Sequence, residues 1–585
     1  MISKEVLSRS RCFSVLAVFI IISIIALSRV GEPSSKEMPD TGDRQQVSHE
    51  KVLPLDPEKP RPENARDERG SSALWRSCIW ESLPTETLNG PEPDPVSEAY
   101  QQNDWKPIFI DSRFGLNQGA ALLLARLHTI ENQAIDPRPF KLDELSQSLD
   151  KLDRCRSTLK AADFGLKDSR AESLSDSAEL LKKYQETFLA AGEADVRLTT
   201  AYFLFAKEMN PFLQKEEYLK ALSGRVPLSK FLQDLAPDTF NYEALISAYA
   251  RYKKLTAQGA QQRVGMTSKA RHGESGNHIR DLQKRLQQED FYSGNITGVY
   301  DAETQRAVKE FQAAHLIDPD GAVGQRTIEW LNVSFRQKSE MIALAIKAVR
   351  QSQTRTRSRF IRINIPQFML EYYKDGRLQE AHKIVVGKAS GKKVKFRGKM
   401  VGENQTPTLT GAIEQVILNP RWYVSDRIRL ELDAAAKSDP EWFTKHGYVS
   451  MSSQYPWGAP RLFQSPGPKN ALGRVKFEFP NPYAVYLHDT PLKHLFARSR
   501  RDFSHGCIRV DKALELAETL LRDDANPYAE KMKSVLTGSR QVFVKLSQPV
   551  LISVEYVPVV TNGSGQVVFA GDPYGILKEN NSQKG

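Results

Sequence analysis

Cysteine is scarce in this chain, with four among 585 residues, at positions 12, 78, 155 and 507. No two cysteines are spaced as CxxC, and no two of the ten histidines are spaced as HxxxH. Tight pairs of this kind mark structural zinc sites, so the sequence predicts no metal and no cofactor. Cys78 and Cys155 leave two alternatives open, a disulfide in an oxidising compartment or two buried thiols.

Long apolar runs are also scarce, and the clearest one lies near the N-terminus. Basic residues precede an apolar segment over residues 12–27, which is the pattern of an export signal. Residues 1–30 therefore form either a signal peptide that is cleaved or an anchor helix that is retained. In both cases we expect the rest of the chain outside the cytoplasm, periplasmic, secreted or anchored to the inner membrane.

Acidic residues are in deficit, because 82 Lys and Arg face 71 Asp and Glu, a formal charge of +11. Such an excess often indicates nucleic acid, but the export segment argues against it and favours an anionic surface of the cell envelope. Residues 388–399 hold six basic residues and no acidic one. This stretch is either a solvated loop or a contact for stem-peptide carboxylates or envelope phosphates.

Aromatic residues are absent from residues 31–72, which are polar and rich in proline. Such a segment cannot bury enough apolar surface to fold, so it is predicted to be a flexible linker. Residues 73–265 carry apolar side chains at helical spacing and are predicted to form a helical scaffold. Within it, Glu193 and Asp195 follow Gly192, and this group is interpreted as an ordinary charged turn.

Residues 276–332 contain three short helical patterns separated by glycine turns, with Asp301 placed as a helix N-cap. Phe311-Gln312 and Gly321-x-x-Gly324 stand where the peptidoglycan-binding domain 1 family has them, so this stretch resembles that family. The resemblance implies either a module that binds glycan or a spacer of the same fold.

From residue 356 the apolar pattern changes to period two, which is typical of strands. Residues 356–548 are predicted to form a mostly β domain, with an aromatic-rich insert at about 423–463 and a helix after Asp511. A hairpin and a polar tail are predicted over 549–585. The fold class is therefore a multidomain α+β protein.

The chemistry lies in the segment Ser504-His505-Gly506-Cys507, and fifteen residues separate His488 from Ser504. A thiolate is a strong nucleophile, and a nearby histidine can take its proton and hold a thiolate–imidazolium pair. Gly506 allows close backbone approach, and N–H groups around Gly506 and Cys507 can stabilise an oxyanion. The dipole of the following helix is expected to favour the thiolate.

This motif resembles that of the L,D-transpeptidase (YkuD-type) catalytic domain. Other matching segments are Val385-Val386-Gly387, Asn419-Pro420 with Trp422, and Asn470–Phe477. The whole arrangement resembles most the large, scaffold-bearing periplasmic members of the YcbB type. Arg509 departs from many members, which have Asn there.

The resemblance implies roles for individual residues. Cys507 is the nucleophile, and His488 is the proton donor and acceptor, oriented by a carbonyl such as that of Asp489. The oxyanion and acceptor region is shaped by Ser504, His505, Gly506 and Arg509. The insert is expected to form a mobile lid, and its candidate substrate contacts are Trp422, Tyr455 and Trp457.

The implied function is peptidoglycan cross-linking, with a tetrapeptide stem as donor, an amine of a second stem as acceptor, and a part in cell wall organisation and cell shape. Two alternatives stay open. A cysteine carboxypeptidase or amidase would use the same site with water, and a non-catalytic protein would only bind the wall.

Overall fold

The computed structural model describes residues 71–83, 94–168, 174–237, 241–265, 270–352, 357–396, 399–437, 439, 441–451, 461–562 and 564–576. The predicted export segment, the linker up to residue 70, and Tyr455 and Trp457 lie outside this set. No helix within the described residues is long and apolar enough to cross a membrane. The chain divides into two units, residues 1–131 with 135–236, and residues 132–134 with 237–585.

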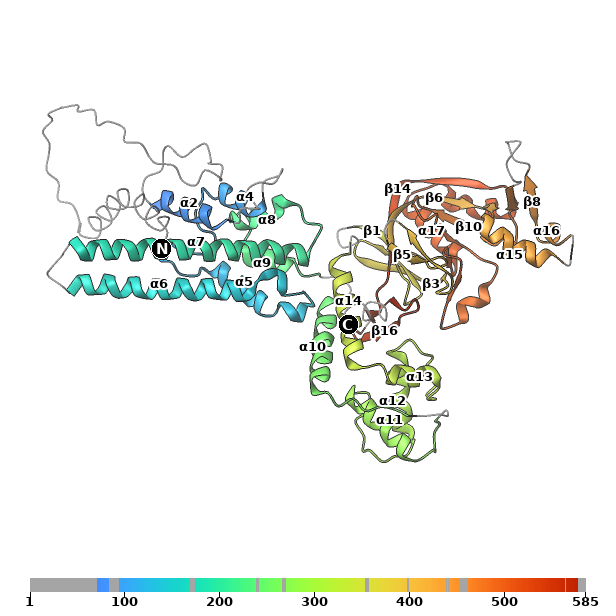
Figure 1. Cartoon of the computed structure of the whole chain (residues 1–585). Coiled ribbons are helices and arrows are strands. Elements are labelled where there is room, and N and C mark those ends of the chain that lie inside the picture. Colours follow the sequence, from blue (N-terminus) through green and yellow to red (C-terminus); the bar gives the residue numbers. More distant parts are fainter. Residues whose placement is uncertain are drawn as a thin grey trace, which may run out of the picture. The chain divides into compact units, whose positions relative to one another are not determined.

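The first unit is helical in its described part, as predicted. Its helices are α2 (Ser71–Ser82), α4 (Pro95–Gln102), α5 (Gln118–His128), α6 (Leu142–Asp168), α7 (Leu174–Met209), α8 (Lys215–Leu222) and α9 (Leu228–Asp234). The two long helices α6 and α7 lie side by side, and α2 packs on α7 (Figure 1).

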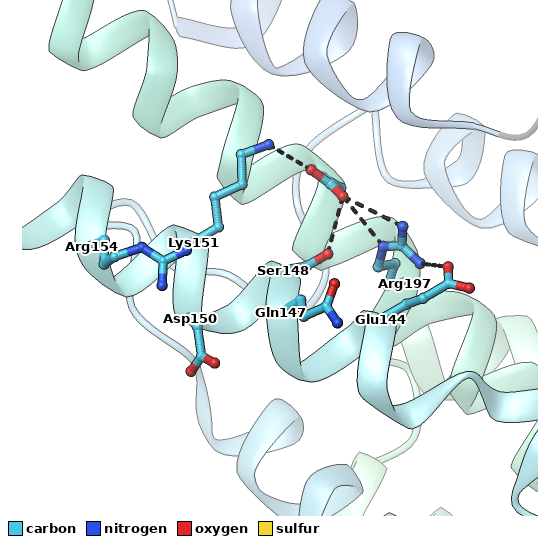
Figure 2. A pocket seen from close by; sticks show the side chains of 8 residues that line it. Glu144, Gln147, Ser148, Asp150, Lys151, Arg154 and Arg197 are labelled. Atoms are coloured by element: carbon cyan, nitrogen blue, oxygen red, sulfur yellow. Dashed lines mark hydrogen bonds and ion pairs between the residues drawn. The ribbon is translucent and has the colours of Figure 1, made fainter.

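The predicted turn at Gly192 is wrong, because Gly192 lies inside α7. A Cβ atom there would approach the backbone of Cys78 to 3.1 Å, so glycine permits close packing of α2 on α7 rather than a turn. Glu193 lines a polar pocket between α6 and α7, where it is bonded to Ser148 and Lys151. Figure 2 shows Ser148 and Lys151 at this pocket. Glu193 and Asp195 lie two positions apart in α7, so their carboxylates point to different sides of the helix and do not form one acidic site.

Asp195 has a structural role in the same helix. Its buried carboxylate accepts bonds from the Tyr100 hydroxyl at 2.6 Å and from the backbone amides of Ile108, Phe109 and Ile110. Burial raises the pKa of Asp195 to about 6. Four donors on one buried carboxylate fix the segment before α5 to the helix.

Both scaffold cysteines, Cys78 and Cys155, are free thiols. The disulfide alternative is therefore not formed in this structure. Cys78 is buried, and burial raises the pKa of its thiol to about 12, which makes it an inert apolar group at neutral pH.

Helix α10 (Tyr242–Gln258) lies in the second unit, so the first unit ends at residue 236, before the predicted scaffold boundary at residue 265. It packs against α14 (Phe335–Arg350), a helix missing from the prediction. Ser334 caps α14 by accepting from the Gln337 amide. This cap, followed by apolar residues at helical spacing, is the signal in the sequence that could have revealed the helix.

The small module between these helices contains α11 (Asn277–Gln288), α12 (Ala302–Ala313) and α13 (Gln325–Leu331). Asp301 caps α12 as predicted, accepting from the Thr304 amide at 2.8 Å. Two glutamines play equivalent parts in successive turns. Gln283 accepts from the Gly298 amide, and Gln312 accepts from the Gly321 amide.

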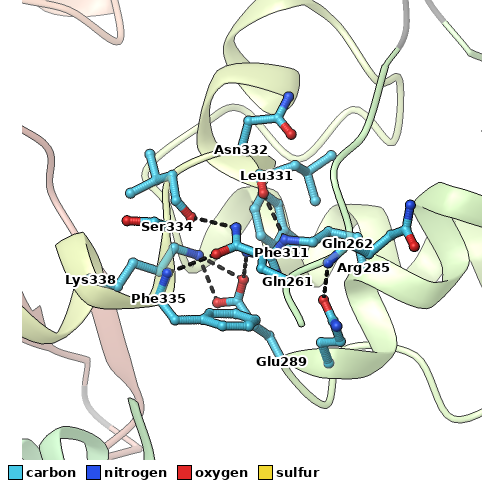
Figure 3. Close-up of polar contacts among 12 residues, drawn as sticks. Gln261, Gln262, Arg285, Glu289, Phe311, Leu331, Asn332, Ser334, Phe335 and Lys338 are labelled. Carbon is cyan, nitrogen blue, oxygen red and sulfur yellow. Dashed lines mark hydrogen bonds and ion pairs between the residues drawn. The ribbon is translucent and has the colours of Figure 1, made fainter. Parts of the chain in front are cut away.

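A buried ionic cluster fastens this module to α14 (Figure 3). The Lys338 ammonium lies 2.6 Å from a carboxylate oxygen of Glu289, and both side chains are fully buried. Arg285 also pairs with Glu289. Burial opposes ionisation of Glu289, but the charges of Lys338 and Arg285 outweigh burial and lower its pKa. The module is therefore joined to α14 through its interior.

The region predicted to be the mostly β domain is built on a nine-stranded sheet in the order β12-β3-β13-β11-β10-β6-β14-β1-β2, and an additional β2–β3 pairing closes this sheet on itself. Its strands are β1 (Arg359–Asn364), β2 (Met369–Lys374), β3 (Arg377–Gly387), β6 (Leu409–Leu418), β10 (Val475–Glu478), β11 (Leu487–His488), β12 (Asp502–Ser504), β13 (Ile508–Val510) and β14 (Val542–Glu555). Alternate residues of these strands form one apolar core with helix α17 (Ala513–Asp523). The mostly β prediction is thus confirmed for the described residues.

The predicted boundary at residue 548 falls inside β14, which pairs with β6 and with β1 in the main sheet. The run after residue 549 is therefore part of this sheet. The C-terminal hairpin is formed instead by β15 (Val559–Thr561) and β16 (Val567–Phe569). Helix α18 (Tyr528–Thr537) packs beside α17.

The aromatic insert forms its own small sheet, β7 (Trp422–Tyr423), β9 (Arg461–Gln464) and β8 (Tyr448–Met451), with helices α15 (Asp426–Ala436) and α16 (Trp442–Lys445). The Trp442 ring stacks on His446 at 4.2 Å and on Tyr448 at 5.7 Å. Trp442 is thus packed within the insert. The basic stretch contains the hairpin of β4 (Lys393–Phe396) and β5 (Lys399–Gly402).

Candidate active site

The register of two short parallel strands assembles the site. Leu487 lies opposite Ile508, and His488 lies opposite Arg509. Leu487 and Ile508 are fully buried in the apolar core. Because side chains alternate along a strand, Tyr486, His488, Cys507 and Arg509 point to the other face of the sheet. The predicted nucleophile and base therefore share one face of two neighbouring strands.

His488 is held by the backbone of the next residue. Its Nδ1 lies 2.5 Å from the carbonyl oxygen of Asp489. A carbonyl only accepts, so Nδ1 carries the proton and Nε2 keeps a lone pair. Asp489 is fixed in turn by the Arg474 amide at 2.9 Å and by Lys493. Burial, followed by the charge of Arg509, lowers the pKa of His488 to about 3.

Cys507 is a neutral thiol in this environment. Burial raises its pKa, although the amide and hydroxyl of Tyr486 and the charges of Lys476 and Arg509 act in the opposite direction. The pKa of His488 is lowered as well, so burial disfavours both charged partners of the predicted thiolate–imidazolium pair.

The turn that carries Cys507, the predicted nucleophile, is held by hydrogen bonds among its own residues. Gly506 has φ +115°, a conformation that side chains other than glycine rarely adopt. The Ser504 hydroxyl donates to the Cys507 carbonyl at 2.6 Å and accepts the Gly506 amide at 3.1 Å. The Gly506 N–H predicted for the oxyanion is thus already engaged, and the amide of Cys507 is the remaining donor of that pair.

Positive charge gathers on the same face. Arg509 is partly buried, and its Nε has no hydrogen-bond partner among the described residues. Burial lowers the pKa of the Arg509 guanidinium. The Lys476 ammonium lies 4.4 Å from the centre of the Tyr486 ring and 2.9 Å from a Glu478 oxygen. An anionic group of a ligand would find an incompletely paired arginine here.

Two predicted residues connect the site to the insert. The His505 ring lies 3.0 Å from a carboxylate oxygen of Glu431 on α15, so its side chain contacts the insert. Trp422, on strand β7 of the insert, and Cys507 both lie near the Tyr486 hydroxyl, since each contributes to the shift of its pKa. Burial raises this pKa most, and the charge of Cys507 raises it further.

Three contributors were missing from the predicted site, namely Tyr486, Lys476 and Thr406. The polar ends of Tyr486 and Lys476 stand at alternate positions of strands next to the motif, which is the signal that could have found them. The hydroxyl of Thr406 donates to the Gly506 carbonyl at 2.8 Å. That contact spans one hundred positions and leaves no local pattern.

The helix predicted after Asp511 is α17, which begins at Ala513 with Lys512 rather than Asp511 as its N-cap residue. Strand β13 lies between Cys507 and this helix along the chain. The effect of its dipole on the thiolate stays a prediction.

Comparison with known proteins places both domains in families. Residues 358–545 match the L,D-transpeptidase catalytic domain (YkuD), and residues 275–331 match the domain described as "Putative peptidoglycan binding domain". The chain therefore carries an L,D-transpeptidase catalytic domain and a domain of the peptidoglycan-binding family. Its assignment to the large YcbB-type group stays a prediction.

A protein of Haemophilus influenzae named "Putative L,D-transpeptidase" is 30% identical over 240 residues, which cover 37% of this chain and 45% of that protein. The chain thus matches less than half the length of this relative. Crystal structures of L,D-transpeptidases from Xylanimonas cellulosilytica and Stackebrandtia nassauensis are 17% and 15% identical, with TM-scores of 0.17 and 0.20. They cover 50% and 51% of this chain and 99% and 97% of their own, and scores this low carry no argument.

Proposed function

We propose that this protein is a peptidoglycan L,D-transpeptidase that forms cross-links through a thioester on Cys507. The observation that carries the proposal is the juxtaposition of Cys507 with a histidine whose Nε2 lone pair is available, on one face of strands β11 and β13. The substrate is a tetrapeptide stem, and the chain acts outside the cytoplasm, where peptidoglycan lies.

In the first step, the Cys507 sulfur attacks the carbonyl carbon of the bond between an L-centre and the terminal D-Ala. His488 Nε2 takes the thiol proton as the carbon–sulfur bond forms. The negative charge moves to the carbonyl oxygen, where the Cys507 amide stabilises it. When the carbon–nitrogen bond breaks, the imidazolium gives its proton to the leaving D-Ala amine, and a thioester remains.

In the second step, an amine of another stem attacks the thioester carbonyl. His488 accepts the amine proton, the carbon–sulfur bond breaks, and the proton returns to the sulfur. Atoms balance over the cycle, because one amide bond is exchanged for another. Neutral His488 and neutral Cys507 suit this cycle, since each step moves one proton between them without a permanent ion pair.

The charged and aromatic neighbours are proposed to bind the stem. Arg509 places an incompletely paired cation beside the nucleophile, and a carboxylate of the stem would complete its hydrogen bonding. Trp422 and the insert, which contacts His505 through Glu431, are proposed to close over the site and exclude water from the thioester. Exclusion of water would favour an amine acceptor over hydrolysis.

The module over 275–331 is proposed to hold the chain on the wall. Deleting the module is a poor test, because the buried Lys338 would lose its partner Glu289 and the rest of the protein would be destabilised. Full-length protein and its Cys507→Ala variant should instead sediment equally with insoluble sacculi. Glycan strands freed of stem peptides should compete, and failure to compete would leave the module as a spacer.

The reaction is tested by incubating the purified protein with tetrapeptide muropeptides and separating the products by mass spectrometry. Cross-linked dimer with release of D-Ala supports the proposal. Tripeptide alone would identify a carboxypeptidase. No turnover by correctly folded protein would identify a wall-binding protein and overturn the proposal.

A further inference from the structure

A tyrosine near the C-terminus reaches the nucleophile turn from outside the matched catalytic domain. Tyr574 follows β16, well beyond residue 545, where the family match ends. Its side chain is buried, with 8% of the residue surface exposed. The Tyr574 hydroxyl donates to the Gly387 carbonyl at 2.8 Å and accepts the Thr406 amide at 3.1 Å.

Thr406 continues this chain of bonds to the nucleophile. Its hydroxyl accepts the Gly387 amide at 2.9 Å and donates to the Gly506 carbonyl at 2.8 Å. A hydroxyl has one proton, so the bond to Gly506 uses it and the direction of the chain is fixed. Tyr574, Thr406 and Gly387 thus form one connected group around the turn.

The bond to Gly506 also controls the next amide. The carbonyl of Gly506 and the N–H of Cys507 belong to one planar trans peptide, so they point in opposite directions. Holding the carbonyl against Thr406 therefore aims the Cys507 N–H away from Thr406. Gly506, at φ +115°, lacks the side chain that would otherwise restrict rotation of this turn.

Tyr574 itself is held firmly. Its amide donates to the Tyr556 hydroxyl at 3.0 Å, and the two rings stack with centres 5.6 Å apart. Earlier in the same segment, the Phe569 amide donates to the Ala314 carbonyl at 2.8 Å, and the Phe569 ring stacks on His315. The C-terminal segment is thereby anchored on the small module before it reaches the nucleophile turn.

We infer that Tyr574 is a positioning residue, which acts through Thr406 to aim the Cys507 amide at the developing oxyanion. The inference rests on the proposed role of Cys507 as nucleophile. It assigns a function to a segment outside the catalytic family match. It also makes the C-terminal segment a structural link between the small module and the catalytic turn.

The test uses Tyr574→Phe and Thr406→Val in the full chain, because each removes one hydroxyl at little cost in volume. Each should lower kcat on tetrapeptide muropeptide about tenfold, with KM changed less than about twofold, as expected for a donor that acts in the transition state. Thr406→Ser keeps a hydroxyl and should recover at least half of the wild-type kcat. The double variant should be little slower than either single one, because both act through one bond.

The matched control is Tyr372→Phe, which removes a buried hydroxyl that donates to Asp523 at 2.7 Å, away from the turn. Tyr372→Phe should leave kcat within about twofold of wild type even where it lowers Tm as much as Tyr574→Phe does. Equal losses of kcat in Tyr574→Phe and Tyr372→Phe would overturn the inference, because the effect would then be general destabilisation.

Two reagents separate this inference from the proposed function. Alkylation of Cys507 by iodoacetamide forms no oxyanion, so its rate should stay within about twofold in Tyr574→Phe. Acylation of Cys507 by p-nitrophenyl acetate does form an oxyanion and should slow about tenfold, even if wild-type protein turns over no muropeptide. If both rates fall together, or neither changes, the positioning role is refuted.

Discussion

Two buried histidines in this protein show how the same physical chemistry serves different ends. His315 in the small module and His488 in the catalytic domain each bond through Nδ1 to a carbonyl, of Phe311 at 2.6 Å and of Asp489 at 2.5 Å. Burial lowers the pKa of both, and a nearby cation lowers it further. Each ring is therefore neutral with the proton on Nδ1.

The difference lies in what surrounds the second nitrogen. His315 Nε2 lies 3.0 Å from the Lys338 ammonium, and that cation is neutralised by Glu289. His488 instead stands beside a thiol and an arginine whose Nε has no partner among the described residues. The two cations near His315, namely Lys338 and Arg285, are both paired with the buried carboxylate of Glu289. No carboxylate pairs with Arg509 among the described residues, where Cys507 is the group that opposes its lowered pKa, so this arginine remains available to bind an anionic ligand.

The largest expected effect comes from exchanging the two histidines for glutamine. His488→Gln should lower kcat by about 10²–10⁴-fold, because it removes the positioned base. His315→Gln should lower Tm but leave kcat within about twofold below the unfolding transition. Muropeptide turnover and thermal unfolding of both variants test this difference between the two histidines. A similar loss of kcat in both variants would contradict it.

Removing the negative charge of Glu289 should show how much the buried ionic cluster contributes to the free energy of unfolding. Glu289→Gln leaves Lys338 and Arg285 buried without their counter-charge and should cost about 3–5 kcal/mol of unfolding free energy. Glu303→Gln, an exposed change in the same module, should cost less than about 0.5 kcal/mol. Urea denaturation measures both, and equal stability of the two variants would contradict the account.

Acid should destabilise the protein through His488. Its pKa is about 3 in the folded chain and about 6.5 when unfolded, so the unfolded chain binds a proton first as pH falls. The stability contribution is complete above pH 6.5 and is lost progressively down to pH 3. Between pH 6.5 and 5, wild type should lose about 2 kcal/mol more than His488→Gln in urea denaturation, and identical losses would refute the low pKa.

The smallest expected effect concerns the insert. Glu431→Gln weakens the contact of α15 with His505 beside the nucleophile, and should raise the ratio of hydrolysed tripeptide to cross-linked dimer about twofold. Glu441→Gln, an exposed change on the same insert, is the control and should not alter that ratio. An unchanged ratio in both would mean that acceptor choice is decided elsewhere.

Features encoded locally were predictable from the sequence, and features made by distant contacts were not. The motif around Cys507, the strands of the β domain and the Asp301 cap are short patterns with a definite period or spacing. Gly192 was misinterpreted because a glycine in a helix that packs closely looks like a turn when the partner helix is unknown. The Tyr574–Thr406 bond joins residues 168 positions apart, and the Glu289–Lys338 pair becomes buried only after α14 packs on the module.

The central claim is that Cys507, with neutral His488 as its base, carries an acyl group from the stem peptide. Intact-protein mass spectrometry after brief mixing with a tetrapeptide stem tests it most directly. The account predicts a mass gain equal to the tripeptide acyl group, located by peptide mapping at Cys507, with release of one D-Ala and no adduct in Cys507→Ala. An adduct that persists in Cys507→Ala, or dimer formed at the wild-type rate by that variant, would contradict it.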